Sequence, residues 1–289
     1  MNMVFLFIMI LVFFCAMLEA ARILCQKEMK NQPEYYEISA VSEVGTRNEQ
    51  QDAVWFSGMQ DMRSFVKTAA DASSLAVVAD GMGGMKNGGV ISRMITEGMK
   101  TAFLSTGRTK DPVAFLQKTL WEINHNVNHY LSECENEKGG STIVTVYLYR
   151  DFLYYLSVGD SRVCLVHNGQ IYQLNVEHIF GNDLDDLAAR GMISAEEARC
   201  NPQRGALTSY VGMEEITRID GNERPILLEK GDVVLLMSDG VFRSVSEEKL
   251  LECAAERDCR KITGKMKEEV VSCHKAKQDN YSVVAIRVL

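Results

Sequence analysis

The chain has 289 residues, which is enough for one large domain or two small ones, and its hydrophobic content of 46% allows a substantial core. Its 39 acidic and 31 basic residues give a formal net charge of −8, which argues against a nucleic-acid-binding protein, since such proteins need a cationic surface. Its 8 cysteines form no C-x-x-C pair and no zinc-type spacing, so we expect free thiols in a reducing compartment.

An apolar segment opens the chain at residues 1–21, and its first 18 residues carry no charge. As a helix, about 18 residues rise about 27 Å, close to the hydrocarbon thickness of a bilayer. No basic residue precedes the run, whereas Arg22, Lys27 and Lys30 follow it. The positive-inside rule therefore predicts an uncleaved single-pass anchor at the cell membrane, with the rest of the chain in the cytoplasm. A signal peptide cleaved beside Ala21, giving a secreted protein, is the alternative.

Residues 22–33 form a short linker, and residues 34–289 contain no repeat or low-complexity stretch, so we expect them to form one domain. Alternating apolar residues and β-branched side chains predict several strands, and the Asn168-Gly169 pair is typical of a tight hairpin turn. Antiparallel pairing is therefore expected. The predicted strands are residues 35–44, 52–57, 74–80, 141–150, 152–161, 162–174, 231–240 and 281–289.

Helical periodicity appears in two pairs of segments between these strands. The first pair is 89–105 and 111–134, the latter with Pro112 in its first turn, and the second pair is 246–255 and 258–273. Strands interleaved with consecutive helices predict an α+β fold, in which packed antiparallel sheets are covered by helices on their outer faces.

A glycine-rich loop follows the predicted strand that ends at Asp80, in the sequence VVADGMGGMKNGGVIS. A Rossmann fingerprint is excluded because Lys86 takes the third glycine position, and no G-K-[ST] sequence completes a P-loop. Asp80 also repels a phosphate unless a cation lies between them. Mg²⁺ and Mn²⁺ prefer carboxylate and carbonyl oxygens, so the loop favours a metal site.

Other lone carboxylates occupy the same kind of position as Asp80. A single aspartate at a strand boundary is ordinarily a turn or cap residue. Five at such boundaries are harder to explain as separate turns, and they predict a shared metal site. They are Asp52, Asp80, Asp160, Asp239 and Asp279.

The order of the motifs R-x-x-x-Q-D, D-G-x-G-G, G-D-S-R, S-D-G and D-N resembles that of the metal-dependent protein serine/threonine phosphatases, the PPM or type 2C family. The resemblance extends from Glu37 to Leu289 and is strongest to the bacterial branch, in which D-G-M-G-G is common. It implies a four-layer αββα sandwich of two antiparallel sheets flanked by helices, with a two-metal centre for Mn²⁺ or Mg²⁺ at one end. Residues 176–204 correspond to the variable flap segment of the family.

The resemblance also implies roles for single residues. Asp80 bridges the two metals, and the Gly81 carbonyl binds the second of them. Asp239 and Asp279 complete the protein ligands of the first metal. Asp52 holds the second metal, directly or through water.

Two more residues complete the implied site. Asp160 matches the acid that helps to bind a third, weaker ion in bacterial members. Arg47 matches the arginine that grips the substrate phosphate, to which a guanidinium offers two parallel hydrogen bonds. Asp80 and Arg47 are thus the expected catalytic pair, and a water between two cations attacks the phosphorus.

The resulting hypothesis is an enzyme that hydrolyses phosphoserine and phosphothreonine in proteins, with a serine/threonine kinase among its implied substrates. The alternative is a membrane-tethered module that binds or senses phosphoproteins with little turnover.

Two other features of the sequence are weaker candidates for functional sites. The i, i+4 pair His125 and His129 has zinc-like spacing but lacks a third ligand, and no motif places a histidine to activate Ser161.

Overall fold

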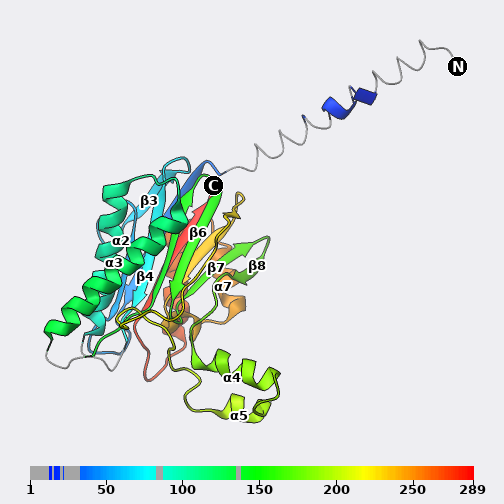
Figure 1. The fold of residues 1–289 in the computed structure, drawn as a ribbon. Coiled ribbons are helices and arrows are strands. Elements are labelled where there is room, and N and C mark those ends of the chain that lie inside the picture. The colour runs from blue at the N-terminus through cyan, green and yellow to red at the C-terminus, as the bar shows by residue number, and fades with distance from the viewer. Residues whose placement is uncertain (1–12, 15, 20–21, 23–32, 83–86, 135–137) are drawn as a thin grey trace.

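The computed structural model describes residues 13–14, 16–19, 22, 33–82, 87–134 and 138–289 (Figure 1). The apolar segment 1–21 and the linker 22–33 lie largely outside these described residues. Within the part of the chain that is described, no helix is both long enough and apolar enough to cross a bilayer.

Two antiparallel sheets pack face to face (Figure 1). The first has the strand order β3-β1-β12-β11-β7-β8, and its strands are β1 (Tyr35–Glu43), β3 (Phe65–Ala69), β7 (Arg162–His167), β8 (Gln170–Gln173), β11 (Val233–Met237) and β12 (Tyr281–Val288). The second has the order β10-β6-β5-β4-β2, and β9 also pairs with β6. Its strands are β2 (Asp52–Phe56), β4 (Ser74–Asp80), β5 (Ile143–Tyr149), β6 (Phe152–Val158), β9 (Asp220–Gly221) and β10 (Ile226–Leu227).

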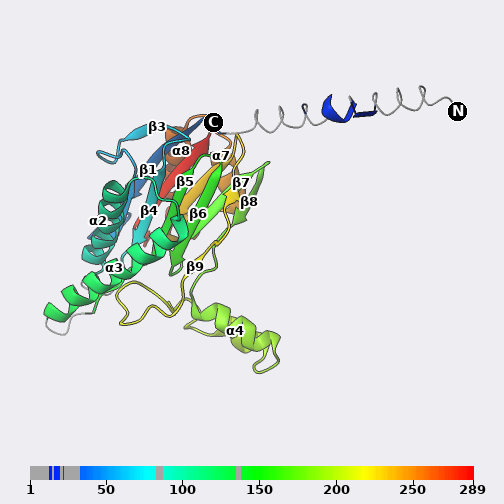
Figure 2. The same cartoon turned by 45° about the horizontal axis from the view of Figure 1, so that its top comes forward.

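Helices cover the outer face of each sheet, which completes the four layers expected from the sequence. On the second sheet lie α2 (Gly88–Thr106) and α3 (Pro112–Glu133), and on the first lie α6 (Asp239–Phe242), α7 (Glu247–Ala254) and α8 (Cys259–Ser272). A separate pair, α4 (Phe180–Ala189) and α5 (Ala195–Cys200), projects from one end of the sandwich, as Figures 1 and 2 both show.

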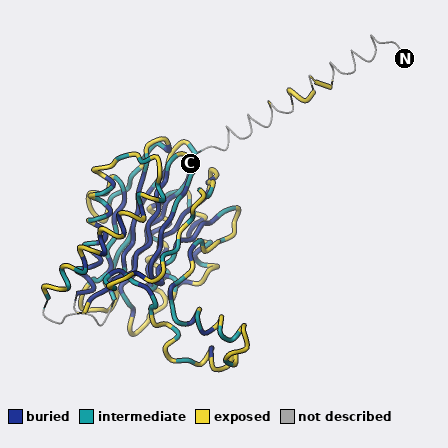
Figure 3. The backbone as a smooth tube through the Cα atoms, viewed as in Figure 1, coloured by how far each residue is buried: buried dark blue, intermediate teal, exposed yellow. Residues whose placement is uncertain are grey.

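Strand β4 shows why this sequence builds a double-sided core. Its alternate residues point to opposite faces of the sheet, so a strand that is buried on both sides must be apolar throughout. Ala76 and Val78 pack between the two sheets, whereas Leu75, Val77 and Ala79 pack against α2 and α3. Figure 3 shows this burial along the central strands, in contrast to the exposed helices α4 and α5.

The strands also bring the predicted site residues to one end of the sandwich. Asp80 ends β4, Asp52 begins β2, and the two residues are paired directly across the sheet. Asp239 follows β11, and Asp279 lies just before β12, the antiparallel neighbour of β11. Chain positions more than 200 residues apart therefore meet at this edge.

Candidate active site

A pocket of about 290 Å³ opens at the end of the sandwich where these strands terminate. Six of the seven residues singled out from the sequence line it. They are Arg47, Asp80, Gly81, Asp160, Asp239 and Asp279. The seventh, Asp52, is not among the lining residues and is only 5% exposed. The structure therefore brings together the set that the motifs selected.

Asp52 and Asp80 form the buried floor of the site. Burial raises the pKa of Asp52 to about 6, although the Ser238 hydroxyl donates a hydrogen bond of 2.8 Å to its Oδ2. Burial also raises the pKa of Asp80 well above its usual range, and the charges of Asp52, Asp239 and Asp160 raise it further. Two carboxylates in this arrangement strongly favour a cation or a shared proton between them.

Asp160 and Asp239 form the wall of the pocket, and both carboxylates contact Arg243. Burial raises the pKa of Asp160 to about 6, and the charge of Asp239 adds to this rise while Arg243 opposes it. For Asp239, burial again raises the pKa, Arg243 lowers it, and Asp279 raises it. The wall is thus a second group of like charges, partly neutralised by one guanidinium.

Arg47 stands at the exposed rim, where its Nη2 lies 2.6 Å from Oδ2 of Asp279. The side chains of Arg47 and Asp279 are 52% and 43% exposed, so this ion pair is accessible to a ligand. Asn280 fixes the loop that carries Arg47, because its side-chain amide donates to the carbonyls of Val44 and Glu49. The guanidinium is therefore presented on a braced loop next to the pocket.

Gly240 explains why the S-D-G motif needs its glycine. A Cβ atom at this position would lie 2.0 Å from the carbonyl oxygen of Asn280, a distance at which backbone must move. The absence of a side chain lets α6 approach the loop before β12, which places Asp239 near Asp279.

The oxygen atoms of this site are suitable ligands for a divalent cation. The buried Oδ1 of Asp52 accepts no hydrogen bond, although a buried carboxylate oxygen normally has a partner. Gly81 has no room for a Cβ, which would lie 2.5 Å from the Gly88 backbone, so no side chain screens this turn of the chain. The aspartates offer carboxylate oxygens, which are the ligand atoms that Mg²⁺ and Mn²⁺ prefer. The described residues nevertheless contain no group of three acidic, histidine or cysteine side chains already at metal-binding spacing.

Sequence reasoning missed four supporting residues. Ser238 binds Asp52, and Asn280 braces the Arg47 loop, as described above. Thr142 accepts a hydrogen bond of 3.2 Å from the Asp80 amide and fixes the end of β4. Arg243 enters the pocket from α6. Its position four residues after Asp239 was the only signal in the sequence, because side chains at this spacing share one face of a helix.

The residues that directly follow the flap segment, Gly205, Ala206 and Leu207, contribute to the lining of the pocket. Arg204 holds the two flap helices together. Its guanidinium forms two hydrogen bonds of 2.9 and 2.8 Å to Asp185 on α4 and one of 2.9 Å to the Ala198 carbonyl on α5. The flap is therefore an ordered unit beside the site.

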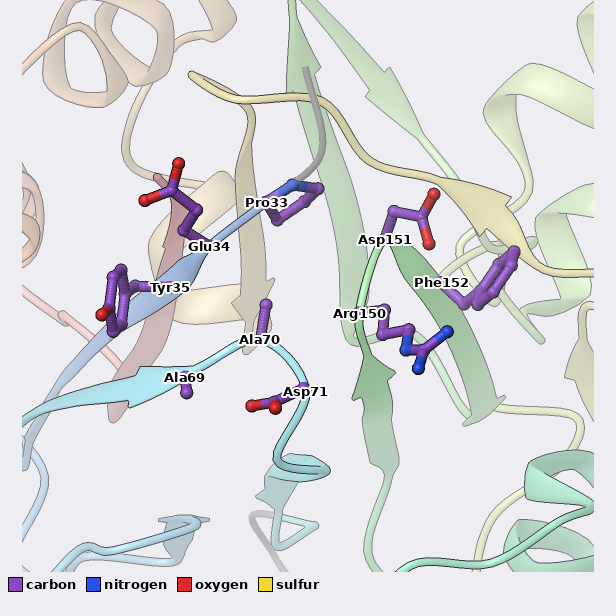
Figure 4. Close-up of a pocket in the computed structure, with 9 residues that line it drawn as sticks. All are labelled: Pro33, Glu34, Tyr35, Ala69, Ala70, Asp71, Arg150, Asp151 and Phe152. Atoms are coloured by element: carbon purple, nitrogen blue, oxygen red, sulfur yellow. The ribbon is translucent and has the colours of Figure 1, made fainter. Parts of the chain in front are cut away.

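A larger hollow of about 560 Å³ lies at the opposite end of the sandwich (Figure 4). It is lined by residues from the start of β1, the end of β3 and the turn between β5 and β6, including Glu34, Asp71 and Arg150. Here Glu34 is already paired with Lys230 at 2.7 Å. We place the chemistry in the smaller pocket, because only there do several buried carboxylates share one space.

The other candidate residues lie elsewhere. His125 and His129 are exposed on α3, and His129 lies 3.7 Å from Glu133. Ser161 is fully buried, and its hydroxyl is hydrogen-bonded to Thr142 at 2.7 Å. The six cysteines of the described residues are all free thiols, as expected.

Comparison with known proteins gives a consistent result. A model of the protein phosphatase 2C family matches residues 57–271. A protein phosphatase 2C-type protein from Streptococcus pyogenes is 32% identical over 184 residues, which cover 62% of this chain and 71% of the relative. Serine/threonine phosphatase Stp1 from Staphylococcus aureus shares the fold with a TM-score of 0.72 and 24% identity, over 87% of this chain and 94% of that one. The catalytic domain of the phosphatase PstP, solved with 2 manganese ions, gives a TM-score of 0.69 and 22% identity, over 88% and 99% of the two chains.

Proposed function

The chain belongs to the protein phosphatase 2C family, and we propose from this premise how its own residues carry out the reaction. It is a metal-dependent protein phosphatase that removes phosphate from phosphoserine and phosphothreonine in proteins. The observation that carries the assignment is the convergence of four aspartates, Asp80, Asp160, Asp239 and Asp279, on one pocket with an exposed arginine at its rim and the buried Asp52 paired with Asp80.

Two Mn²⁺ or Mg²⁺ ions are the cofactors implied by the family, and we propose which residues hold them. Asp80 would contribute to holding both ions, and the Gly81 carbonyl and Asp52 would hold the second. Asp239 and Asp279 would hold the first. The raised pKa of Asp80 and the partnerless Oδ1 of Asp52 support this choice. When bound, the two ions supply an activated water as nucleophile and neutralise the phosphoryl oxygens.

Substrate phosphate is held by Arg47 in this proposal. Its ion pair with Asp279 is half exposed, so exchanging this partner for a phosphate costs little desolvation. A guanidinium gives the phosphate two parallel hydrogen bonds and so orients the phosphorus toward the buried carboxylates. The further expectation, a third and weaker ion at Asp160, stays a prediction, and Arg243 bears on it below.

The remaining elements of the proposal concern the setting of the enzyme. Substrates are phosphoproteins, and we include a serine/threonine kinase among them on the family resemblance alone. Residues 34–289 form the phosphatase domain, with 176–204 as its flap. We propose that residues 1–21 attach it to the cell membrane with the domain in the cytoplasm, on the strength of Arg22, Lys27 and Lys30 after the apolar run.

The experiment that tests the function is hydrolysis of a phosphothreonine peptide by the full chain after EDTA treatment. Added Mn²⁺ is expected to restore phosphate release in the native chain and not in Asp80→Asn. A phosphoprotein-binding module with little turnover, the alternative, would bind the peptide and release no phosphate under any metal condition. That result would overturn the assignment as an enzyme.

A further inference from the structure

Arg243 is a charged residue of the pocket lining that the family motifs did not select. It follows α6 directly and is four residues beyond Asp239, so the two side chains lie on one face of the turn. Its backbone is fixed on both sides. The Arg243 amide donates to the Asp239 carbonyl at 3.0 Å, and Nζ of Lys275 donates to the Arg243 carbonyl at 2.5 Å.

The guanidinium of Arg243 bridges two carboxylates from different parts of the chain. Nη1 lies 2.9 Å from Oδ2 of Asp239, and Nη2 lies 3.2 Å from Oδ2 of Asp160. The two acidic side chains are only 16% and 10% exposed. Two buried like charges destabilise the fold unless a cation compensates them, and here one group contacts both.

Asp160 is the acid that the family resemblance assigns to a third ion, and Arg243 joins this carboxylate to Asp239. An arginine in this place has two advantages over a weakly held ion. It is part of the chain, so it does not dissociate, and a guanidinium stays protonated at every working pH. A divalent cation approaching Asp160 would also be repelled by a positive charge already in hydrogen-bonding contact with that carboxylate.

Arg47 provides the internal contrast. It has one acidic partner, Asp279, and that partner is 43% exposed, so the pair can open toward a phosphate. Arg243 has two partners, and both are mostly buried. The two arginine side chains are about equally exposed, at 52% and 55%, so their partners distinguish them: Arg47 can exchange one exposed carboxylate for substrate, whereas two largely buried carboxylates hold Arg243.

We propose that Arg243 takes the place of the third ion, as a built-in cation between Asp160 and Asp239, so that this phosphatase binds two metal ions rather than three. The inference rests on the proposed two-metal function. Arg243 acts as a positioning residue in it, because its charge fixes Asp239 beside the metal centre without contacting the reacting atoms.

The test is a count of bound Mn²⁺ in the full chain after EDTA treatment, by titration with electron paramagnetic resonance of the free ion. The native chain is expected to bind two ions, and Asp160→Asn is expected to leave this number at two. Arg243→Gln is expected to bind three, and the double variant Arg243→Gln/Asp160→Asn two again. The matched control is Arg190→Gln, which removes another i, i+4 arginine pair, with Asp186 on the exposed flap, and should leave the number at two.

Three results would overturn the inference. The first is a third ion in the native chain that Asp160→Asn removes. The second is a count of two in an Arg243→Gln variant whose circular dichroism matches the native protein. If that variant does not fold, the native chain and Asp160→Asn still decide the question. The third is a native chain that binds no Mn²⁺. This result differs from the other two because it would also exclude the proposed two-metal function.

Discussion

Asp80 and Asp52 face each other from neighbouring strands with pKa values raised by burial, so each carboxylate costs stability when it is charged and uncompensated. Replacing Asp80 by asparagine is therefore expected to separate function from stability. Activity with Mn²⁺ should fall by about 100-fold or more, because a ligand shared by both ions is lost. The melting temperature in EDTA should stay the same or rise, because a buried charge is removed.

Phosphate release and thermal unfolding of the same preparation measure these two effects. Full turnover in Asp80→Asn would show that this carboxylate is not a metal ligand. A large fall in the melting temperature would instead assign it a structural role.

Arg47 should act on substrate and not on metal. Arg47→Ala is expected to lower kcat/KM for small phosphate esters by about 10- to 100-fold, mainly through KM, since a charge-assisted hydrogen bond contributes about 1.5–3 kcal/mol. Mn²⁺ binding measured by calorimetry should not change. The exposed Arg63, outside the pocket, provides the control as Arg63→Ala. Unchanged kinetic constants in Arg47→Ala would remove the arginine from the substrate site.

Among single residues, the sequence could identify those whose chemistry does not suit their surroundings in the chain. Asp80 could be found because a carboxylate before a glycine-rich loop contradicts ordinary phosphate binding. Arg243 could not, since an arginine after a short helix is normally paired with water alone, and only the packing of α6 against the loop before β12 brings its half-exposed guanidinium to Asp160 and Asp239. Thr142, just before β5, and Ser238, the first residue of the S-D-G motif, were given no role, because a hydroxyl beside a strand end becomes a site residue only through its neighbours.

Helices α2 and α3 cross closely at Gly98. A Cβ at this position would lie 2.6 Å from Cγ1 of Ile123, whereas a Cβ at Gly264 in α8 meets nothing within 4 Å. Replacing a helical glycine by alanine ordinarily stabilises a helix by about 0.5–1 kcal/mol. We expect that gain for Gly264→Ala in denaturant unfolding, and a loss of about 1–3 kcal/mol for Gly98→Ala, because the crossing is overpacked.

Combination with Ile123→Val should recover part of the loss in Gly98→Ala, because the two side chains compete for one space. Equal stabilisation by both alanine variants would mean that the helices do not pack as described. Strict additivity of Gly98→Ala and Ile123→Val would mean the same.

Long apolar elements were predictable from the sequence, and short or polar ones were not. Strands such as β4 and β12 and the helices α2, α3, α7 and α8 were expected within a few residues of their bounds. The Asn168-Gly169 turn was also correct, with φ values of 49° and 75°. The edge strand β3 was missed because five residues with Lys67 in the middle carry little periodicity. Helices α4 and α5 were missed because they are short and mostly exposed: Arg204 ties both together, and α5 also has a capping box of Ser194 and Glu197.

The pH dependence of stability is a property of the whole carboxylate group. Because burial raises the pKa values of Asp52 and Asp160 to about 6 and also those of Asp80 and Asp239, the folded protein binds protons more tightly than the unfolded chain. In EDTA, the free energy of unfolding should therefore rise as the pH falls from 7.5 through 6. The buried His178 has a lowered pKa, so it opposes this trend as the pH falls below about 6.5.

Added Mn²⁺ should raise the melting temperature at pH 7.5 and flatten the profile, because ions replace protons among the carboxylates. Asp52→Asn should flatten the profile in EDTA as well. A melting temperature in EDTA that falls steadily from pH 7.5 to pH 6 would contradict the raised carboxyl pKa values.

Membrane attachment is the prediction that decides which substrates the enzyme meets. The full chain should fractionate with membranes, and protease added to intact cells should leave the domain whole. A matched variant in which Arg22, Lys27 and Lys30 are all replaced by glutamine tests the charge rule, since its orientation should become mixed. Digestion of the native domain from outside, or a mature chain that starts near Ala21, would indicate an exported phosphatase.

The central claim is that the aspartates at one end of the sandwich hold two metal ions where phosphate is cleaved. Anomalous diffraction at the manganese edge, from crystals of the EDTA-treated protein soaked in Mn²⁺, tests it most directly. We predict two peaks that share the Asp80 carboxylate, with Asp52, Asp239 and Asp279 as their other acidic neighbours. Peaks only elsewhere on the molecule, or none in crystals of an active preparation, would contradict the account.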